Sequence, residues 1–309
     1  MLTFWKQDNG LKQLKKYEKN SWINVVAPTQ EEISYLTDIQ RVPLDFITDI
    51  LDIDERSRSE VEGRWLLIII RIPVHSKQTG VPYYTIPLGV LISMNCIITI
   101  CLNENDVLRD IFLLPKYRYI NLQNKVSFVL QLFLSSATCY LRYLKDINRI
   151  NNDIENELVK SAKNKELHYL LKMEKCLVYF VTSLKSNELL LHKLQRSRLV
   201  INQEVDEDLM EDVITEYKQA IEISKIYSDI QAGMMDTFAS VISNNVNFVM
   251  KQLTSVTIIL MIPTLIASLY GMNVPNFLEG NKYAFWIILA FTSFITFLGV
   301  LFFRRRNWF

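Results

Sequence analysis

The sequence predicts an α+β cytoplasmic domain followed by a long helical stalk and two transmembrane helices near the C-terminus. Residues 252–278 and 283–303 contain no Asp, Glu, Lys or Arg, and each stretch reaches the roughly 20 apolar residues that a membrane span needs. Short runs of β-branched and aromatic residues are concentrated in the first 115 residues and are typical of strands. Between residue 211 and Pro263 the chain contains one glycine and no proline, which favours one long helix.

Residues 1–125 are expected to form a cytoplasmic α/β domain, with a helix over residues 30–51. Its strand candidates are residues 21–26, 65–70, 88–93 and 96–102. Residues 126–205 are expected to form a cytoplasmic helical hairpin. Residues 126–196 contain neither proline nor glycine and repeat Leu, Ile and Tyr at helical spacing.

The stalk helix (206–252) is expected to continue directly into the first transmembrane helix (253–273). Taken as one helix, residues 211–270 extend about 90 Å, of which about 30 Å lie in the bilayer. A helix that projects this far needs partners along its length. Self-association around an axis would supply them.

The second transmembrane helix is predicted over residues 283–303, after a short outer loop (274–282). A basic cytoplasmic tail (304–309) begins with three arginines, so the positive-inside rule places the C-terminus in the cytoplasm. With two spans, the N-terminus is cytoplasmic as well. The predicted location is the cell membrane.

The sequence lacks the patterns typical of nucleic-acid binding, nucleotide binding and catalysis. A net charge of +1 gives no basic excess for nucleic acid. There is no Gly-rich phosphate loop and no nucleophile elbow, so we expect neither a nucleotide partner nor an enzyme. The four cysteines form no CxxC pair and are expected to be reduced cytosolic thiols.

One face of the predicted long helix carries small, polar, acidic or methionine side chains at alternating steps of three and four residues. Its members, here called the polar stripe, are Asp229, Gly233, Asp236, Ser240, Ser243, Asn247, Met250, Thr254, Thr257, Met261, Thr264 and Ser268. This spacing is typical of a helix assembly, whose contact surface is normally apolar. A polar face that enters the membrane indicates water, and predicts an ion pathway with Asp229 and Asp236 as cation-attracting acids at its inner mouth.

The alternative is that the membrane hydroxyls bond carbonyls four residues earlier and pack against the second span. The acidic and amide residues on the same face favour the pathway. Ile259 is expected to face lipid.

Tyr270-Gly271-Met272-Asn273, at the outer end of the first span, resembles the YGMN signature of the CorA magnesium/cobalt channel family. The motif is specific here because a short loop, a last span and a basic tail follow it. Residues 22–24, 43–56 and 244–254 are also similar to CorA segments, so the resemblance covers essentially the whole chain. The outer loop departs from the family's usual Met-Pro-Glu-Leu, and Glu279 is the candidate for its acidic residue.

The resemblance implies a funnel-shaped homopentamer in the lipid bilayer, with Gly271, Met272 and Asn273 as selectivity filter. It implies that the pore is lined by Asn247, Met250, Leu253, Thr254, Thr257, Met261, Thr264 and Ser268. Met250 and Leu253 are gate candidates, because apolar rings can close a pore by dewetting.

Five Asn273 amides offer neutral oxygens that can hydrogen-bond a hydrated ion without trapping it, and Mg²⁺ sheds its water reluctantly. Gly271 is expected to permit the turn that aims these oxygens inward. The alternative for Asn273 is a helix C-cap.

The resemblance also implies that Asp49 and Asp212 hold regulatory Mg²⁺ between neighbouring subunits. Other acids at the start of the stalk, such as Asp208, are interpreted as favourable charges at a helix N-terminus.

The predicted function is a divalent cation channel for Mg²⁺ influx down the membrane potential, gated by cytoplasmic Mg²⁺, with Co²⁺ and Ni²⁺ as further candidate ions. Two other functions stay open. One is a zinc or other divalent metal transporter similar to the ZntB branch of the same fold. The other is a non-conducting, membrane-anchored sensor or scaffold, which would not explain a polar stripe inside the membrane.

Overall fold

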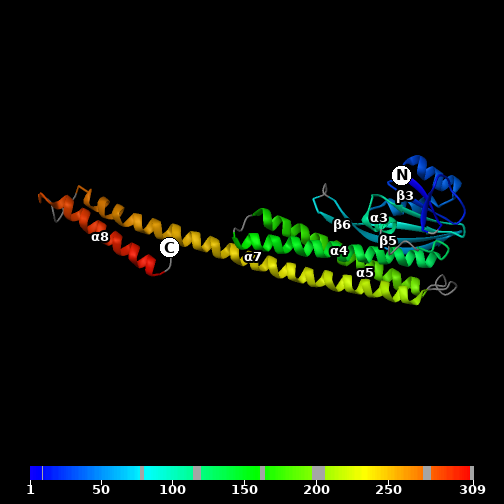
Figure 1. The fold of residues 1–309 in the computed structure, drawn as a ribbon. Coiled ribbons are helices and arrows are strands. Elements are labelled where there is room, and N and C mark those ends of the chain that lie inside the picture. Colours follow the sequence, from blue (N-terminus) through cyan, green and yellow to red (C-terminus); the bar gives the residue numbers. More distant parts are fainter. Residues whose placement is uncertain are drawn as a thin grey trace. The chain divides into compact units, whose positions relative to one another are not determined.

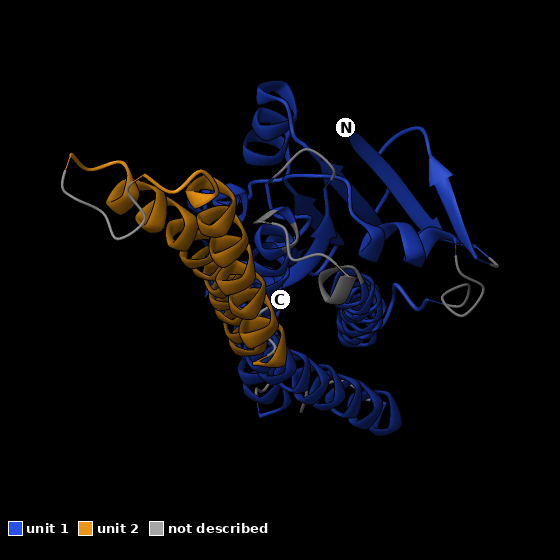
Figure 2. Cartoon of the chain, turned by 90° about the vertical axis from the view of Figure 1, so that its left-hand side faces the viewer, with its two compact units in different colours: residues 1–235 blue, residues 236–309 orange. Residues whose placement is uncertain are grey.

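The computed structural model describes residues 1–8, 10–76, 80–113, 120–160, 164–196, 206–273 and 280–306. The chain divides into two compact units, Met1–Met235 and Asp236–Phe309, which Figure 2 colours separately. The first unit contains a β-sheet with helices on both faces, and the second contains the apolar helices (Figure 1).

The first unit is built on a seven-stranded sheet with the order β2-β1-β3-β7-β6-β5-β4. β3 and β7 are parallel, and the other neighbouring pairs are antiparallel. The strands are β1 (Leu2–Gln7), β2 (Leu11–Leu14), β3 (Ser21–Val26), β4 (Arg58–Glu62), β5 (Trp65–His75), β6 (Tyr83–Ile92) and β7 (Cys96–Cys101). The prediction from sequence missed β1, β2 and β4, because these strands are only partly buried and mix apolar with polar residues.

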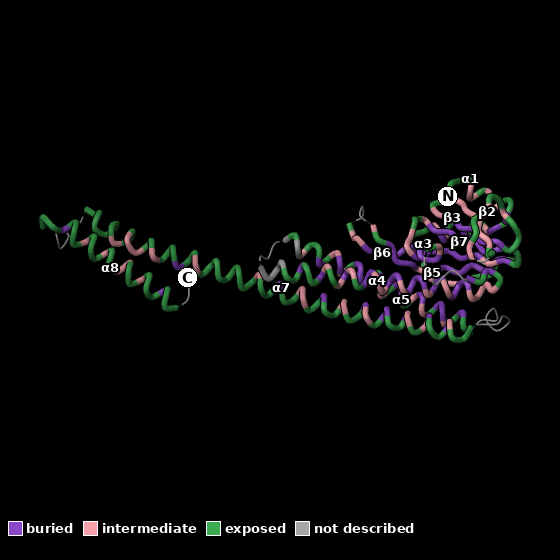
Figure 3. The backbone as a smooth tube through the Cα atoms, viewed as in Figure 1, coloured by how far each residue is buried: buried purple, intermediate pink, exposed green. Residues whose placement is uncertain are grey.

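Both faces of the central strands are buried (Figure 3). In β5, Leu66, Ile68 and Ile70 belong to one apolar cluster, whereas Leu67 and Ile69 belong to a second cluster. Alternate residues of a strand point to opposite sides of its sheet, so the two clusters are the two covered faces. A strand covered on both sides is a continuous apolar run, as β5 is.

The N-terminal helices cover one face of the sheet. They are α1 (Gln30–Ser34), the π-helical turn η1 (Tyr35–Ile39) and α2 (Leu44–Leu51). The prediction of a single helix over residues 30–51 is wrong. Arg41 has a φ of 55°, in the left-handed region, and Pro43 is the N-cap of α2. Proline lacks a backbone N–H and disfavours helical geometry in the residue before it, so the chain restarts there.

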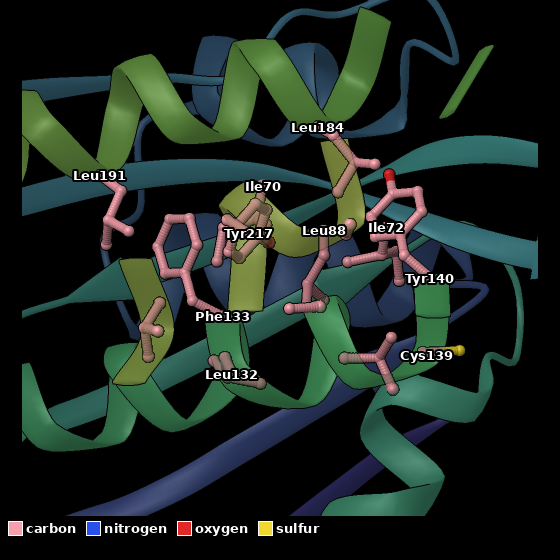
Figure 4. Close-up of a cluster of buried hydrophobic side chains, with 14 of the residues drawn as sticks. Ile70, Ile72, Leu88, Leu132, Phe133, Cys139, Tyr140, Leu184, Leu191 and Tyr217 are labelled. Carbon is pink, nitrogen blue, oxygen red and sulfur yellow. The ribbon is translucent and has the colours of Figure 1, made fainter. Parts of the chain in front are cut away.

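The other face is covered by helices that meet in one apolar core. They are α3 (Asp106–Leu113), α4 (Lys125–Lys160), α5 (Asn164–Gln195) and the first part of α7 (Glu207–Tyr270). Figure 4 shows Phe133 of α4 beside Tyr217 of α7, with Leu191 of α5 nearby. The rings of Phe133 and Tyr217 lie 5.8 Å apart in a T-shaped arrangement. The start of α7 is therefore anchored in the same core as the sheet.

A fully buried amide, Asn187 of α5, links β5 to α7. Its Oδ1 accepts hydrogen bonds from the Arg71 backbone N–H at 2.9 Å and from Ser57 Oγ at 2.6 Å. Its Nδ2 donates to the Arg71 carbonyl at 2.7 Å and to Tyr217 Oη at 3.3 Å. β4 pairs with β5 only as far as Ile69. Asn187 thus completes the open edge of β5 in place of a strand, as buried backbone groups require.

The second unit consists of the C-terminal part of α7 and of α8 (Ala284–Arg305). Both helices are long and apolar enough to span a membrane. They pack at Gly299 of α8, where an added Cβ would lie 3.7 Å from Ile262 Cδ1 and 4.0 Å from Ile259 Cγ1. The prediction that Ile259 faces lipid is therefore wrong, since Ile259 contacts α8. Small residues such as Gly299 let membrane helices approach closely.

Close packing of α2 on β6 depends on Gly89. A Cβ at Gly89 would lie 2.2 Å from Ile50 Cδ1 and 2.3 Å from Ile50 Cγ1, and Ile50 is completely buried. We expect Gly89→Ala to destabilise the protein by about 1–3 kcal/mol, because overpacking forces α2 away from the sheet. The measurement is the midpoint of unfolding of the purified protein. Adding Ile50→Ala should recover part of the loss, and a loss unaffected by Ile50→Ala would contradict the contact.

Candidate ion pathway and cation sites

The polar stripe and the α8 contact lie on opposite faces of α7. Ser255 is fully buried, and Ile259 and Ile262 lie on the same side, facing Gly299 of α8. At 100° per residue, Thr264 lies about half a turn from Ser255. The stripe residues that follow are all exposed in the single chain: Asn247, Met250, Thr254, Thr257, Met261, Thr264 and Ser268. The stripe therefore does not pack against the second span.

The hydroxyls of the stripe bond to their own helix. Thr257 Oγ1 donates to the Leu253 carbonyl and Thr264 Oγ1 to the Leu260 carbonyl, each at 2.8 Å. This half of the alternative prediction is right. The membrane serine that does face α8 is Ser255, which is outside the stripe. Each bonded hydroxyl keeps lone pairs for a further partner, so the stripe offers neutral oxygen acceptors on the face away from α8.

Large apolar side chains lie near the middle of the stripe. Met250 and Leu253 are 55% and 60% exposed, which is costly for residues of this size unless another surface covers them. Asp229 and Asp236 are exposed further toward the N-terminus of α7, seven residues apart. Side chains seven residues apart share one helix face. The acids, the apolar pair and the hydroxyls thus follow one another in order along α7.

The predicted filter begins where α7 ends, at Tyr270. The Gly271 N–H donates to the Ala267 carbonyl at 2.9 Å, and a Cβ at Gly271 would lie 3.3 Å from that oxygen. Among the described glycines, positive φ angles occur at Gly10, Gly63 and Gly280. Gly271 is not among them, so glycine is favoured here by the close carbonyl and not by a left-handed backbone. The expected turn that aims the Asn273 oxygens inward stays a prediction.

Met272 and Asn273 follow α7 and are exposed. The selectivity-filter role of Asn273 and its helix C-cap alternative both stay predictions. Glu279 lies outside the described residues.

Asp49 lies on α2 and is paired with Arg58. Arg58 Nη2 donates to Asp49 Oδ2 at 2.5 Å, and Arg58 Nε donates to Glu55 Oε1 at 2.8 Å. Glu60 is a third carboxylate partner of the same guanidinium. Burial lowers the pKa of Arg58, but the hydrogen bonds to Glu55 and Glu60 outweigh it and raise the pKa above its ordinary value. Arg58 is therefore a permanent cation beside Asp49.

Asp212 lies on α7 and is exposed, next to the fully buried Val213. Val213 belongs to the cluster on the α4–α5 face of the sheet, whereas α2 packs on the opposite face. Asp49 and Asp212 of one chain are thus separated by the sheet. Carboxylate oxygens are the donors that Mg²⁺ prefers, so both residues fit the ion chemically. A shared site requires one of them from a second copy.

Sequence reasoning missed the partners that surround Asp49 and the Asn187 link. Arg58 follows Asp49 by nine residues, a spacing that no local motif associates with an ion pair. Ser57 and Asn187 are 130 residues apart. The mixture of acids and arginine between residues 49 and 60 was visible in the sequence, but only the turn between α2 and β4 brings these charges together.

Comparison with known proteins supports the resemblance to the CorA family. The family model described as CorA-like Mg²⁺ transporter protein matches residues 17–305. The chain is 29% identical over 294 residues to the cobalt/magnesium transport protein CorA of Methanocaldococcus jannaschii, covering 93% of this chain and 90% of the relative. The complete structure of the CorA magnesium transporter from the same organism superposes with a TM-score of 0.83, at 26% identity, over 100% of this chain and 99% of that one.

The zinc alternative has a structural counterpart as well. The ZntB cytoplasmic domain from Vibrio parahaemolyticus superposes with a TM-score of 0.59 at 14% identity, covering 79% of this chain and 97% of that domain. A likeness at this identity concerns the fold alone.

The geometry predicts which positions react with water-soluble thiol reagents. Cysteines at Thr257, Met261 and Thr264 should be labelled in membranes, because thiolate formation needs water. The matched control is Phe297→Cys, since Phe297 is 59% exposed on α8, where lipid excludes water. Rates should differ by at least about tenfold, measured as labelling per minute at one pH. Similar rates at both sets of positions would contradict a water-filled face.

The four native cysteines should add little background to this measurement. All are buried, and burial raises the pKa of Cys101 and Cys176 to about 11 and that of Cys139 to about 12. Burial also raises the pKa of Cys96. At neutral pH these thiols are protonated and inaccessible, so single-cysteine variants can be compared in the wild-type background.

Proposed function

The chain belongs to the family of CorA-like Mg²⁺ transporter proteins, and we propose that it is a homopentameric Mg²⁺ channel of the cell membrane. Five copies of α7 surround a central axis, with the polar stripe facing the axis and α8 facing lipid. The observation that carries this proposal is the position of the stripe, half a helical turn away from the α8 contact. A polar membrane face that does not pack on its own chain needs water or other copies of itself.

The ion path passes amide, hydroxyl, apolar and acidic side chains in turn along α7. Mg²⁺, the substrate, enters from outside at the Asn273 ring, where amide oxygens hydrogen-bond its water shell. The Thr264, Thr257 and Thr254 oxygens continue this neutral lining. Met250 and Leu253 form an apolar gate that closes by dewetting. Asp236 and Asp229 raise the local cation concentration at the inner mouth.

The membrane potential supplies the driving force. The arginines after α8 favour a cytoplasmic C-terminus, and two spans then place the N-terminal unit in the cytoplasm too. Moving a divalent cation inward gains about 4.6 kcal/mol per 100 mV. No nucleotide is needed for uptake.

Cytoplasmic Mg²⁺ regulates the channel through Asp49 of one subunit and Asp212 of its neighbour. Bound Mg²⁺ links the subunits and stabilises the closed ring. When Mg²⁺ is scarce, the carboxylates repel one another and the open state gains population, as expected for a ligand that prefers one of two states. Gating of this kind closes the channel when the cell has enough magnesium.

Co²⁺ and Ni²⁺ share the octahedral hydration of Mg²⁺ and are further candidate substrates. The relative from Methanocaldococcus jannaschii is named a cobalt/magnesium transport protein. Zinc sites in proteins usually contain nitrogen or sulfur ligands. The proposed filter contributes amide oxygens, which favours magnesium.

Asn273→Ala should reduce Mg²⁺ uptake into liposomes by at least about a hundredfold, since removing the amides leaves no ring to hold the hydrated ion. The measurement is the signal of a Mg²⁺-sensitive dye inside the liposomes under an imposed potential. Size-exclusion chromatography should show an unchanged oligomer, because the α7 and α8 contacts are intact. Wild-type uptake by an assembled Asn273→Ala channel would refute the filter assignment. Competition by Co²⁺, Ni²⁺ and Zn²⁺ in the same assay ranks the substrates.

Millimolar Mg²⁺ should protect the first unit and the stalk from protease. Asp212→Ala should need about two- to tenfold more Mg²⁺ for half-maximal protection, because one ligand of the regulatory ion is lost. Asp208→Ala is the matched control. Asp208 lies one turn earlier on the same helix and is also exposed, but has no assigned role. Identical Mg²⁺ dependence in wild type and Asp212→Ala would disprove the assignment of Asp212 and leave the pore unaffected.

A further inference from the structure

Arg58, the first residue of β4, places its guanidinium among three carboxylates. It donates to Asp49 Oδ2 at 2.5 Å, to Glu55 Oε1 at 2.8 Å, and to Glu60. One positive charge therefore faces three negative charges. Arg58 and its three carboxylate partners together carry a net negative charge.

The two partners Arg58 and Asp49 are anchored separately. Arg58 is opposite Ile69 in the β4–β5 ladder, and Lys193 of α5 donates to the carbonyl of the next residue, Ser59, at 3.2 Å. Asp49 is carried by α2, whose Ile50 is buried against β6. The ion pair joins two elements that other contacts already hold, so its loss leaves both elements in place.

The pair is open to solvent. The side chains of Arg58 and Asp49 are 32% and 36% exposed. Partly exposed ion pairs are weak and respond to competing ions. If another cation takes Asp49, Arg58 keeps Glu55 and Glu60 as partners, so the exchange leaves no buried charge unpaired.

We propose that Arg58 is a resident counter-cation that competes with Mg²⁺ for Asp49 and so sets the Mg²⁺ concentration at which the sensor fills. The proposal rests on the function proposed above for Asp49 as a Mg²⁺ ligand. At low Mg²⁺ the guanidinium occupies Oδ2. As Mg²⁺ rises, the divalent ion takes the carboxylate, and Arg58 is held by Glu55 and Glu60. Competition lowers the apparent affinity of the site and shifts the response to higher Mg²⁺.

A role for Arg58 in orienting Asp49 would change the Mg²⁺ affinity of the variant in the opposite direction. If Arg58 served to orient Asp49 for the metal, removing it would weaken Mg²⁺ binding. If it competes, removing it strengthens Mg²⁺ binding. A single titration therefore separates the two roles.

The experiment titrates free Mg²⁺ against protease protection of the full-length protein in detergent, a readout independent of transport. The variants are Arg58→Gln, which removes the charge, Arg58→Lys, which keeps it, and Asp49→Asn. Arg58→Gln should lower the half-protecting Mg²⁺ concentration by about two- to fivefold, the range expected for a partly exposed pair. Arg58→Lys should stay within about twofold of wild type. The effect of Arg58→Gln should vanish when it is combined with Asp49→Asn.

Size-exclusion chromatography and circular dichroism without Mg²⁺ establish that each variant is folded. If Arg58→Gln fails to fold, Arg58→Lys decides instead, because a tenfold shift in that charge-preserving variant is incompatible with simple competition. An unchanged or raised half-protecting concentration in Arg58→Gln overturns the proposal, provided that Asp49→Asn loses protection. If Mg²⁺ does not protect the wild type, the sensor function itself fails, and this proposal fails with it.

Discussion

The proposed function depends on a physical difference between two faces of the part of α7 that lies in the second unit. One face is covered by α8 near Ser255 and Ile262. The other carries acids, amides, hydroxyls and methionines that stay exposed in the described part of the chain. Such a face is stable in a membrane only beside water or beside other copies. The proposed ring of identical chains would provide both.

Features that repeat along one helix could be predicted from the sequence, because a helix converts spacing directly into position. The polar stripe from Asp229 to Ser268 was found in this way, whereas the Gly-Met-Asn motif was identified by its resemblance to the CorA family. Local interruptions of a helix were harder to predict from the sequence. The break at Arg41 and Pro43 was missed because the apolar spacing of residues 30–51 continues across it. Ile259 was assigned to lipid because no local signal shows which face of α7 meets α8.

Interactions between distant segments could not be predicted at all. Asn187 reaches Arg71, Ser57 and Tyr217, which belong to three other parts of the first unit. Its amide fixes the edge of β5 and the start of α7 relative to the loop that leads into Arg58. Asp212 lies close in sequence to Tyr217, so this network holds the part of α7 that carries it. Asp49 is held by the packing of α2 on β6 through Ile50. A metal site shared between copies needs such a rigid frame to keep its two ligands in register.

The weakness of each proposed sensor site is compatible with strong regulation. Shifting a two-state equilibrium from 1:99 to 99:1 requires a difference in binding free energy of about 5.5 kcal/mol. In the proposed homopentamer, five equivalent interfaces that each favoured the closed state by about 1 kcal/mol would approach this value together. The steepness of the response to Mg²⁺ would thus come from the coupling of identical sites, and no single site needs to bind Mg²⁺ tightly. In that proposed assembly, a counter-cation such as Arg58 at every interface would move the threshold of all five sites equally. The response would shift along the concentration axis and keep its steepness, because the number of coupled sites is unchanged.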